Sequence, residues 1–249
     1  MILGCDISTY QGTVSFQRME DAGAKFVIMR KQTGYYGDTK FFENLEKAKL
    51  TGLKIGAYGV PFVGYDINKQ YDKFIEGISP SDLDFPPFPD IERRHTYSQN
   101  KAITDVLAYT NKLKAWWGDA VFYTAKYIWQ EMYSSAKGWI DDWDLWVANY
   151  TVSAEPFYIP IGWEFRKDGT PVAKADSYAL WQFSADGNGR GAEFGAQSAD
   201  IDLDWMKQWF WDKHVENAPS LSQTPSVPYE VALAIPKSAD SIVLTLNRG

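Results

Sequence analysis

Two carboxylates lie one residue apart in the stretch FPPFPDIERR, residues 85–94. Side chains at i and i+2 of a β-strand project to the same face, so Asp90 and Glu92 would point the same way. Two carboxylates held close repel each other when both are ionised, which raises one pKa and leaves an acid beside a base. Glycoside hydrolysis uses such a pair. Simple ion pairing with Arg93 or Arg94 is the structural alternative.

Two further acids occupy comparable places in the sequence. Asp6 ends the first predicted strand, and Asp202 lies in the last one. In a barrel enzyme the carboxyl ends of the strands surround the active site, so the four acids would converge there. A divalent metal is a second reason for clustered acids, but the chain has only two histidines and neither an HExxH nor an EF-hand pattern. We expect these acids to be catalytic, with no metal and no cofactor.

The elements that must position these acids alternate along the chain. Short apolar segments indicate strands at 2–7, 25–31, 53–60, 85–92, 120–124, 144–150, 178–183 and 199–205. Helical patterns separate the first six, whereas loops join the last three, which predicts a β/α barrel. An open doubly wound sheet is the alternative. It is weakened because DISTYQG follows the first strand in place of a Gly-rich phosphate-binding turn.

Helix boundaries can also be predicted from capping residues. Asp38 is a candidate N-cap, and Gly52 a candidate closing residue, for the helix that contains KFFENLEKAKL. A second helix is expected from Ser98 to Gly118. We predict a catalytic barrel over residues 1–215.

The C-terminal part of the chain has a different character. Residues 216–228 are rich in Ser, Pro and Thr and indicate a linker. Residues 229–249 predict two strands around a PKSAD turn, a β-hairpin tail. A lone hairpin is marginal in water, so the tail would act as a binding element, self-associate, pack on the barrel or belong to a longer module. The oligomeric state stays open.

Composition excludes several classes of protein. The chain has 249 residues, 45% of them hydrophobic, and a formal net charge of −7, which argues against nucleic acid as a partner. No apolar run is long enough for membrane insertion, and the first residues lack the features of a signal peptide. Aromatic residues make up 16% of the chain, which fits a large core or a cleft that stacks on sugar rings.

The chain resembles family 25 of the glycoside hydrolases, the Chalaropsis-type lysozymes, over about residues 2–206. The matching pieces, in order, are GCDISTYQG, RKQTGYYGDTKFFENLEKAKLTGLKIGAYG, PDIE, VFYT, LWVANY, LWQF and IDLD. The resemblance implies a flattened TIM-like barrel of five β/α units followed by three strands. It also implies hydrolysis of the β-1,4 bond between N-acetylmuramic acid and N-acetylglucosamine in bacterial peptidoglycan.

The resemblance also implies roles for individual residues. Glu92 matches the general acid, Asp90 its neighbouring carboxylate, and Asp6 and Asp202 the two further acids. Residues expected to contact the sugars are Tyr58, Tyr123, Trp146, Asn149, Trp181 and Gln182. Gly59 stands where the family often has His, and Phe62 is expected to fill part of that space. Arg93 is expected to meet a carboxylate of the substrate or to hold the acids.

Two other functions remain open on the sequence. A chitinase-type barrel ends its fourth strand in DxDxE, but the first of those acids is Phe88 in this chain. A non-catalytic wall-binding or virion protein could keep the barrel, although a binder has no use for a proton donor. A wall-cutting enzyme without a signal peptide would be made in a host cytoplasm and released as a phage or prophage endolysin.

Overall fold

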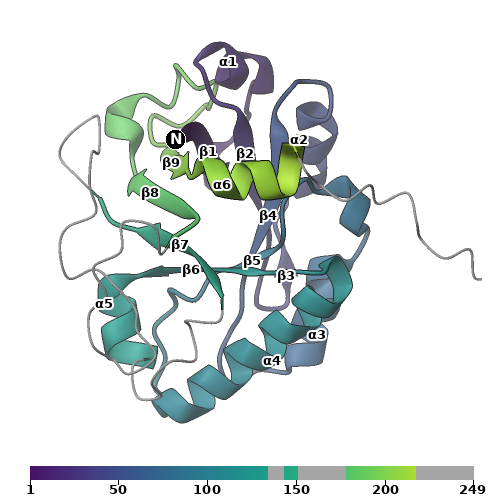
Figure 1. The fold of residues 1–249 in the computed structure, drawn as a ribbon, viewed down its shortest axis with the longest axis vertical. Coiled ribbons are helices and arrows are strands. Elements are labelled where there is room, and N and C mark those ends of the chain that lie inside the picture. Colours follow the sequence, from purple (N-terminus) through teal and green to yellow (C-terminus); the bar gives the residue numbers. More distant parts are fainter. Residues whose placement is uncertain (134–142, 151–177, 217–249) are drawn as a thin grey trace, which may run out of the picture. The chain divides into compact units, whose positions relative to one another are not determined.

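Eight strands form a nearly closed barrel in the computed structural model, which describes residues 1–133, 143–150 and 178–216 (Figure 1). The strands are β1 (Ile2–Ile7), β2 (Phe26–Thr33), β4 (Lys54–Val60), β5 (Phe88–Pro89), β6 (Val121–Ala125), β7 (Asp144–Ala148), β8 (Leu180–Ser184) and β9 (Asp202–Met206). Their order around the sheet is β5-β4-β2-β1-β9-β8-β7-β6, and the short β3 (Tyr36–Gly37) pairs with β2. The predicted flattened TIM-like barrel is confirmed.

The gap between β5 and β6 is bridged beyond the regular part of β5. Asp90 pairs with Tyr123 in an isolated parallel bridge, and the backbone N–H of Ile91 donates to the carbonyl of Tyr123 at 3.0 Å. Only Phe88 and Pro89 of the predicted strand 85–92 have regular strand pairing. The prolines leave few donors for a longer ladder. The segment that carries Asp90 and Glu92 therefore closes the barrel.

Strand direction decides which residues reach the active-site edge. β1 pairs in parallel with β2, and β7 in parallel with β8, whereas β9 runs antiparallel to both β1 and β8. The beginning of β9 therefore lies at the edge where the parallel strands end. Asp6 near the end of β1 and Asp202 at the start of β9 are direct cross-strand partners.

Helices connect the parallel strands of the first half. They are α1 (Phe16–Asp21), α2 (Phe41–Ala48), α3 (Ile67–Ile75), α4 (Gln99–Trp117) and the short α5 (Lys126–Ile128), while α6 (Gln208–Trp211) follows β9. α3 and α4 lie side by side on one flank of the sheet (Figure 1). Between β8 and β9 the chain forms only a short 3-10 turn, Gly187–Gly189, in agreement with the predicted loss of helices.

The capping predictions had different outcomes. α4 begins after Ser98, whose hydroxyl accepts the N–H of Lys101 at 3.3 Å, and ends at Gly118, which has φ of 111°. The prediction for the earlier helix was wrong, because Lys40 precedes α2 and Lys49 follows it. Asp38 lies two residues too early: its Oδ1 accepts the backbone N–H of Lys40 at 2.9 Å, and its Oδ2 accepts from the Arg30 guanidinium at 2.8 Å.

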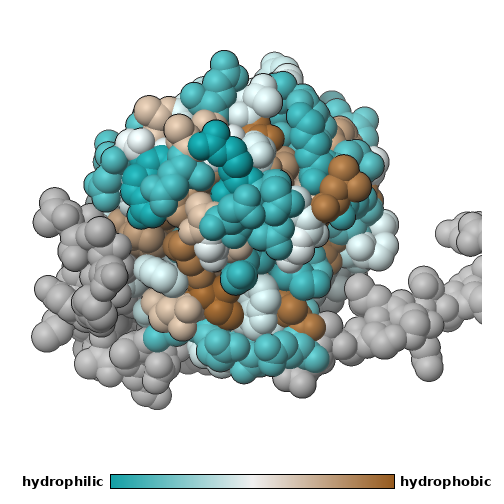
Figure 2. Space-filling view, turned by 90° about the horizontal axis from the view of Figure 1, so that it is seen from above, coloured by the Kyte–Doolittle hydropathy of each residue, from teal (hydrophilic) through white to brown (hydrophobic). Residues whose placement is uncertain are grey.

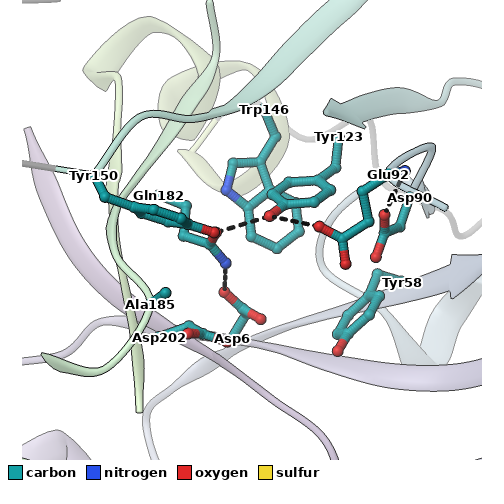
Figure 3. Close-up of a pocket in the computed structure, with 10 residues that line it drawn as sticks. All are labelled: Asp6, Tyr58, Asp90, Glu92, Tyr123, Trp146, Tyr150, Gln182, Ala185 and Asp202. Carbon is teal, nitrogen blue, oxygen red and sulfur yellow. Dashed lines mark hydrogen bonds between the residues drawn. The ribbon is translucent and has the colours of Figure 1, made fainter. Parts of the chain in front are cut away.

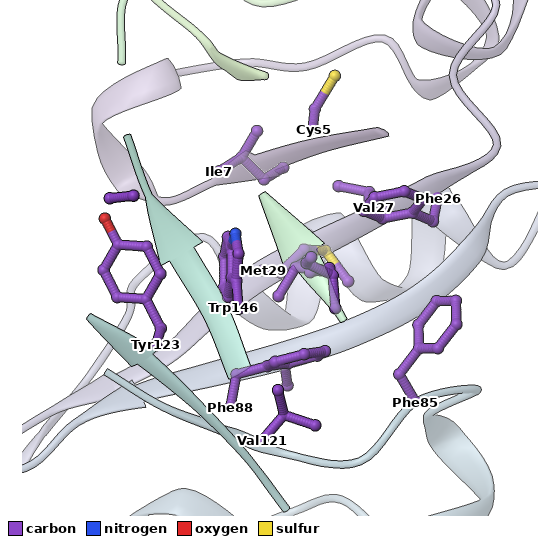
Figure 4. Packing of buried hydrophobic residues seen from close by; sticks show 14 of the residues in the cluster. Cys5, Ile7, Phe26, Val27, Met29, Phe85, Phe88, Val121, Tyr123 and Trp146 are labelled. Atoms are coloured by element: carbon purple, nitrogen blue, oxygen red, sulfur yellow. The ribbon is translucent and has the colours of Figure 1, made fainter. Parts of the chain in front are cut away.

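Large aromatic side chains fill the barrel. Trp146 contacts Phe88 at 5.3 Å between ring centroids and Tyr123 at 4.6 Å, both edge to face (Figure 4). Met29 lies near Trp146 in the same view, and its side chain is 1% exposed. The interior of the barrel is therefore a packed core of side chains.

The described residues belong to one compact unit, Met1–Ala218. Most of the predicted linker and all of the predicted hairpin tail, residues 217–249, lie outside the described residues. Hydrophilic residues cover much of the face in Figure 2, with apolar residues in smaller groups. In the part of the chain that the structure describes, no helix combines the length and apolar character that crossing a membrane requires.

Candidate active site

A pocket of about 150 Å³ opens at the edge of the barrel where the parallel strands end (Figure 3). Its lining consists of Asp6, Tyr58, Asp90, Glu92, Tyr123, Trp146, Tyr150, Gln182, Ala185 and Asp202. The four acids that the sequence singled out therefore share one cavity. They come from the ends of β1 and β5 and the start of β9.

The two acids beyond β5 have different surroundings. Asp90 is 4% exposed, and its Oδ1 accepts the backbone N–H of Glu92 at 3.2 Å. Glu92 has an exposed side chain at the mouth of the pocket, and its Oε2 lies 3.4 Å from the Tyr123 hydroxyl. The pair therefore combines a fixed carboxyl inside the pocket with a freer one at its entrance.

The opposite side of the pocket is a cluster around Asp6. Gln182 Nε2 donates to Asp6 Oδ2 at 2.6 Å. Asp202 lies opposite Asp6 in the ladder and Asp204 lies two residues further along β9, so the charge of Asp6 adds to the rise in the pKa of both carboxyls. Asp204 is fully buried and also accepts from Trp146 Nε1 at 2.8 Å. This cluster is tied together by hydrogen bonds within the barrel.

A chain of hydrogen bonds joins the two sides. Tyr150 donates to Gln182 Oε1 at 2.9 Å, and the Tyr123 hydroxyl lies 2.8 Å from the same oxygen (Figure 3). Because Gln182 Oε1 already accepts a hydrogen bond from Tyr150, the Tyr123 hydroxyl can donate its proton to a hydrogen bond with Glu92. Gln182 therefore links Asp6 to the entrance of the pocket through one tyrosine.

Burial and mutual repulsion keep protons in this site. Burial raises the pKa of Asp6 to about 7, even though the hydrogen bond from Gln182 lowers it. Burial and then the charge of Asp6 raise the pKa of Asp202 to about 10. Burial raises the pKa of Asp90, to which the charge of Glu92 adds, and burial also raises the pKa of Glu92. The site therefore holds acids and bases together at neutral pH.

Four predicted contact residues do not line this pocket. Trp181 is 1% exposed, and its Nε1 donates to the carbonyl of Asn149 at 2.8 Å. The backbone N–H of Asn149 in turn donates to the carbonyl of Gln182 at 3.0 Å, so these two residues brace the wall. Phe62 and Arg93 lie against each other beside the pocket, with the Arg93 Cζ 3.7 Å from the centre of the Phe62 ring.

The expectation that Phe62 replaces a missing side chain at position 59 was wrong. A Cβ on Gly59 would lie 2.5 Å from the Tyr109 hydroxyl and 2.8 Å from Phe74 Cδ2. Position 59 thus faces α3 and α4, because it alternates with Tyr58, which faces the pocket. Phe62 fills no part of that space.

Sequence reasoning missed three residues of the site. Tyr150 follows β7 directly, so an aromatic residue just past a strand end was a usable signal. Asp204 shares a face with Asp202 by the i, i+2 rule, which also could have identified it. Ala185 lines the pocket with a small side chain, and nothing in the sequence distinguishes it.

Neither histidine belongs to the pocket lining. The His95 ring packs edge to face on Tyr133, with centroids 5.8 Å apart. His214 is 8% exposed, and its ring lies 4.4 Å from the Phe210 ring. The site therefore works with carboxyls, a carboxamide and hydroxyls.

Comparison with known proteins agrees with this geometry. A curated relative, the autolytic lysozyme of Clostridium acetobutylicum, is 26% identical over 183 residues, which are 73% of this chain and 55% of the relative. The chain spans 55% and 66% of the lengths of the two curated relatives it matches. It therefore corresponds to part of those proteins.

Solved structures share the fold. A family 25 glycosyl hydrolase from Bacillus anthracis superposes with a TM-score of 0.65 at 20% identity, covering 83% of this chain and 88% of the other. The CTP1L endolysin superposes with a TM-score of 0.64 at 23% identity, covering 85% and 68% of the two chains. The profile of the family described as "Glycosyl hydrolases family 25" matches residues 5–192. The chain belongs to glycosyl hydrolase family 25.

Proposed function

We propose that this protein is a lysozyme that hydrolyses the β-1,4 bond between N-acetylmuramic acid and N-acetylglucosamine in bacterial peptidoglycan. The observation that carries the proposal is the pairing of Glu92, exposed at the entrance, with the buried Asp90 in a pocket lined by Tyr58, Tyr123 and Trp146. Membership of the family and the lysozyme name of a curated relative support it.

Glu92 acts as the general acid in this proposal. Its carboxyl must be neutral at working pH to protonate the glycosidic oxygen, and desolvation of the carboxyl group in the pocket raises its pKa in that direction. The Tyr123 hydroxyl, 3.4 Å away, stabilises the carboxylate that remains after the proton is given up. Its exposed position allows Glu92 to meet the bond between two sugars.

Asp90 stabilises positive charge that develops on the reacting sugar. The residue before the cleaved bond carries a 2-acetamido group, whose carbonyl oxygen can attack the anomeric carbon while Asp90 orients the amide. Substrate assistance of this kind retains the anomeric configuration and is a recognised variant of the two-carboxylate mechanism. Proton NMR of the first-formed product tests it: we expect the β anomer, and an initial α anomer contradicts this route.

Asp6 and Asp202 serve the reaction indirectly. Their cross-strand pairing and the bond from Gln182 hold one wall of the pocket and its charge in place. Burial raises the pKa of Asp6, Asp202 and Asp204, and the charge of Asp6 adds to the rise for the other two. We assign them to orientation and electrostatic tuning, and we assign proton transfer to Glu92.

The decisive experiment is digestion of insoluble peptidoglycan followed by mass analysis of the released fragments. A lysozyme leaves the new reducing end on muramic acid. A new reducing end on glucosamine would indicate a different glycosidase, and no new end would indicate a wall-binding or virion protein. The variant Glu46→Gln, on the exposed face of α2, is the matched control for loss at Glu92.

The route to the wall forms a separate proposal. We infer release from a host cell as an endolysin, which the structural likeness to the CTP1L endolysin supports. Expression of the chain inside a bacterial host, with and without a membrane-permeabilising protein, tests it. Lysis should occur only when the membrane is opened, and lysis without that step contradicts the proposal.

A further inference from the structure

A second, larger hollow lies next to the pocket and shares Glu92 with it. It has a volume of about 580 Å³, and three arginines, Arg30, Arg93 and Arg94, contribute to its lining. Among the described residues that line it, Glu92 is the only acid. A ligand that contacts Glu92 in the first pocket therefore extends towards a wall that is rich in guanidinium groups.

Two of the three arginines already have carboxylate partners. Arg30 Nε lies 2.8 Å from Asp38 Oδ2, and both side chains are largely buried. Arg94 Nη2 lies 2.8 Å from Glu131 Oε2, with side chains 61% and 46% exposed. Exposed pairs of this kind contribute little and are screened by salt. Neither arginine pairs with Asp90 or Glu92 among the described contacts, so these arginines do not serve to hold the acids.

Arg93 is different from the other two. Its guanidinium Cζ lies over the Phe62 ring, 3.7 Å from the ring centre, and among the described residues it has no carboxylate partner. Phe62 is itself held edge to face by Tyr65, with centroids 5.5 Å apart. Stacking fixes the plane of a guanidinium while its N–H edges stay free to donate. Arg93 is therefore a preoriented cation beside the catalytic acid.

The chemistry of the substrate identifies the group that such a cation would meet. The sugar rings of peptidoglycan carry neutral hydroxyls and acetamido groups. Each muramyl residue also carries a lactyl ether at O3, which ends in a carboxylate or continues into a peptide with carboxylates of its own. Bidentate binding of a carboxylate is the contact that a guanidinium makes best.

We propose that Arg93, stacked on Phe62, binds a carboxylate attached through the lactyl ether of the muramyl residue at the cleaved bond. This inference rests on the proposed function and specifies the substrate further. Arg30 and Arg94 are paired with Asp38 and Glu131, so Arg93 is the arginine of this hollow with no carboxylate partner among the described residues. The enzyme thereby distinguishes the muramyl glycan of the wall from neutral amino-sugar polymers.

Three forms of one teichoic-acid-free glycan separate the two sources of the carboxylate. The first is intact peptidoglycan, and the second is the same material with its peptides removed by an amidase, which frees the lactyl carboxylate. The third is the peptide-free glycan with that carboxylate converted to a neutral methylamide. Initial rates of reducing-end release are compared for wild type, Arg93→Gln and Arg93→Lys, with the exposed Arg18→Gln on α1 as the control.

We expect wild type to prefer the charged glycans, and Arg93→Gln to lower the ratio of charged to neutral rates about tenfold, the effect of losing one charge-assisted contact. Arg93→Lys should keep part of the preference for charged over neutral glycan, and Arg18→Gln should keep all of it. A drop confined to intact peptidoglycan assigns the contact to peptide carboxylates; a drop on peptide-free glycan assigns it to the lactyl carboxylate. Equal ratios in wild type and Arg93→Gln overturn the proposal.

A binding measurement keeps this result independent of catalysis. Glu92→Gln and the double variant Glu92→Gln, Arg93→Gln are co-sedimented with intact peptidoglycan and with peptidoglycan whose carboxylates have been amidated. Arg93 should favour the charged material, more strongly at low salt than at high salt. If the chain shows this binding preference but no lysozyme activity, the carboxylate site is supported while the proposed function is not. Identical binding by both variants overturns the carboxylate site.

Discussion

The two acidic sides of the pocket are built from different kinds of structure. Asp6 and Asp202 face each other in a regular antiparallel ladder, and Gln182 hydrogen-bonds Asp6. Asp90 and Glu92 follow a strand with only two regularly paired residues. Asp6 on the ladder side is buried, whereas Glu92 on the other side is exposed at the entrance and also lines the arginine-rich hollow.

This difference matches the different demands of holding and transferring a proton. A carboxyl that must reach a glycosidic oxygen needs exposure and freedom to turn, and the end of an interrupted strand provides both. A carboxyl that only sets the local charge is better placed where neighbouring groups prevent it from moving. The hydrogen bonds of Gln182 and Tyr123 connect Asp6 on the ladder side to Glu92 at the entrance.

The largest effect should come from removing the proton donor. Glu92→Gln keeps the size of the side chain but cannot protonate the leaving oxygen, so we expect lytic activity to fall by about 10³-fold, within the usual range for a general acid. Clearing of a cell-wall suspension measures it, with thermal unfolding as the control for folding. A near wild-type rate would show that Glu92 is not the proton donor.

Asp90→Asn should rank second. The amide keeps the acceptor for the N–H of Glu92 but removes the negative charge next to the reacting sugar, so we expect a loss of about 10²-fold, typical of one preorganised electrostatic contact. Single-turnover rates on soluble glycan fragments measure the chemical step. The exposed Asp200→Asn is the matched control. A change in substrate affinity with no change in this rate would contradict the assignment.

Asp6→Asn should cost less than either substitution on the Glu92 side. It replaces the acceptor at the centre of the ladder cluster but leaves the donor and its partner intact, so we expect about a tenfold loss, comparable to one charge-assisted hydrogen bond. The same clearing assay measures it. A loss of activity as large as that of Glu92→Gln would contradict the assignment of Asp6 to orientation and of Glu92 to proton transfer.

Asp202→Asn should have the smallest effect on activity but a distinct effect on stability. The pKa of Asp202 rises from 3.8 to about 10 in the folded protein, so between these pH values the unfolded chain is ionised while the folded one keeps its proton. This contribution to stability is therefore full below about pH 4 and falls as the pH rises towards 10.

The amide in Asp202→Asn cannot ionise and removes this dependence. We expect the melting temperature of the variant to gain several degrees on that of wild type between pH 5 and pH 9, since a domain of this size shifts by roughly 2–4 °C per kcal/mol. Calorimetry across that range measures the gain. A difference that does not change with pH would show that Asp202 is ionised in the folded protein.

Much of the site could be predicted because the side chains of a strand alternate between its two faces, and this alternation can be read from the sequence. The i, i+2 rule and the strand ends located Asp90 and Glu92, and the family likeness added Tyr58, Tyr123 and Gln182, all of which line the pocket. By the same rule, Trp181 and Gln182 cannot both face the pocket, because neighbouring residues of a strand face opposite sides of the sheet. Burial of Trp181 follows from that alternation.

Other features depended on contacts between distant segments. The antiparallel direction of β9 has no sequence signature of its own, and it determines that Asp202 faces Asp6. The stacking of Arg93 on Phe62 joins two loops separated by about thirty residues, so the arginine pair after Glu92 could not be interpreted from its neighbours. The Asp38 carboxylate also joins distant segments, since it accepts from Arg30 on β2 as well as from the backbone N–H of Lys40 before α2.

The sequence alone determined the order of strands and helices, the barrel they form and the four acids at one edge of it, because hydrophobic period and residue type are local properties. Only the tertiary structure decided how protons are divided among Asp6, Asp90, Glu92 and Asp202. The pKa of a carboxyl depends on how far it is buried and which charges surround it, and both are set by segments far apart in the chain.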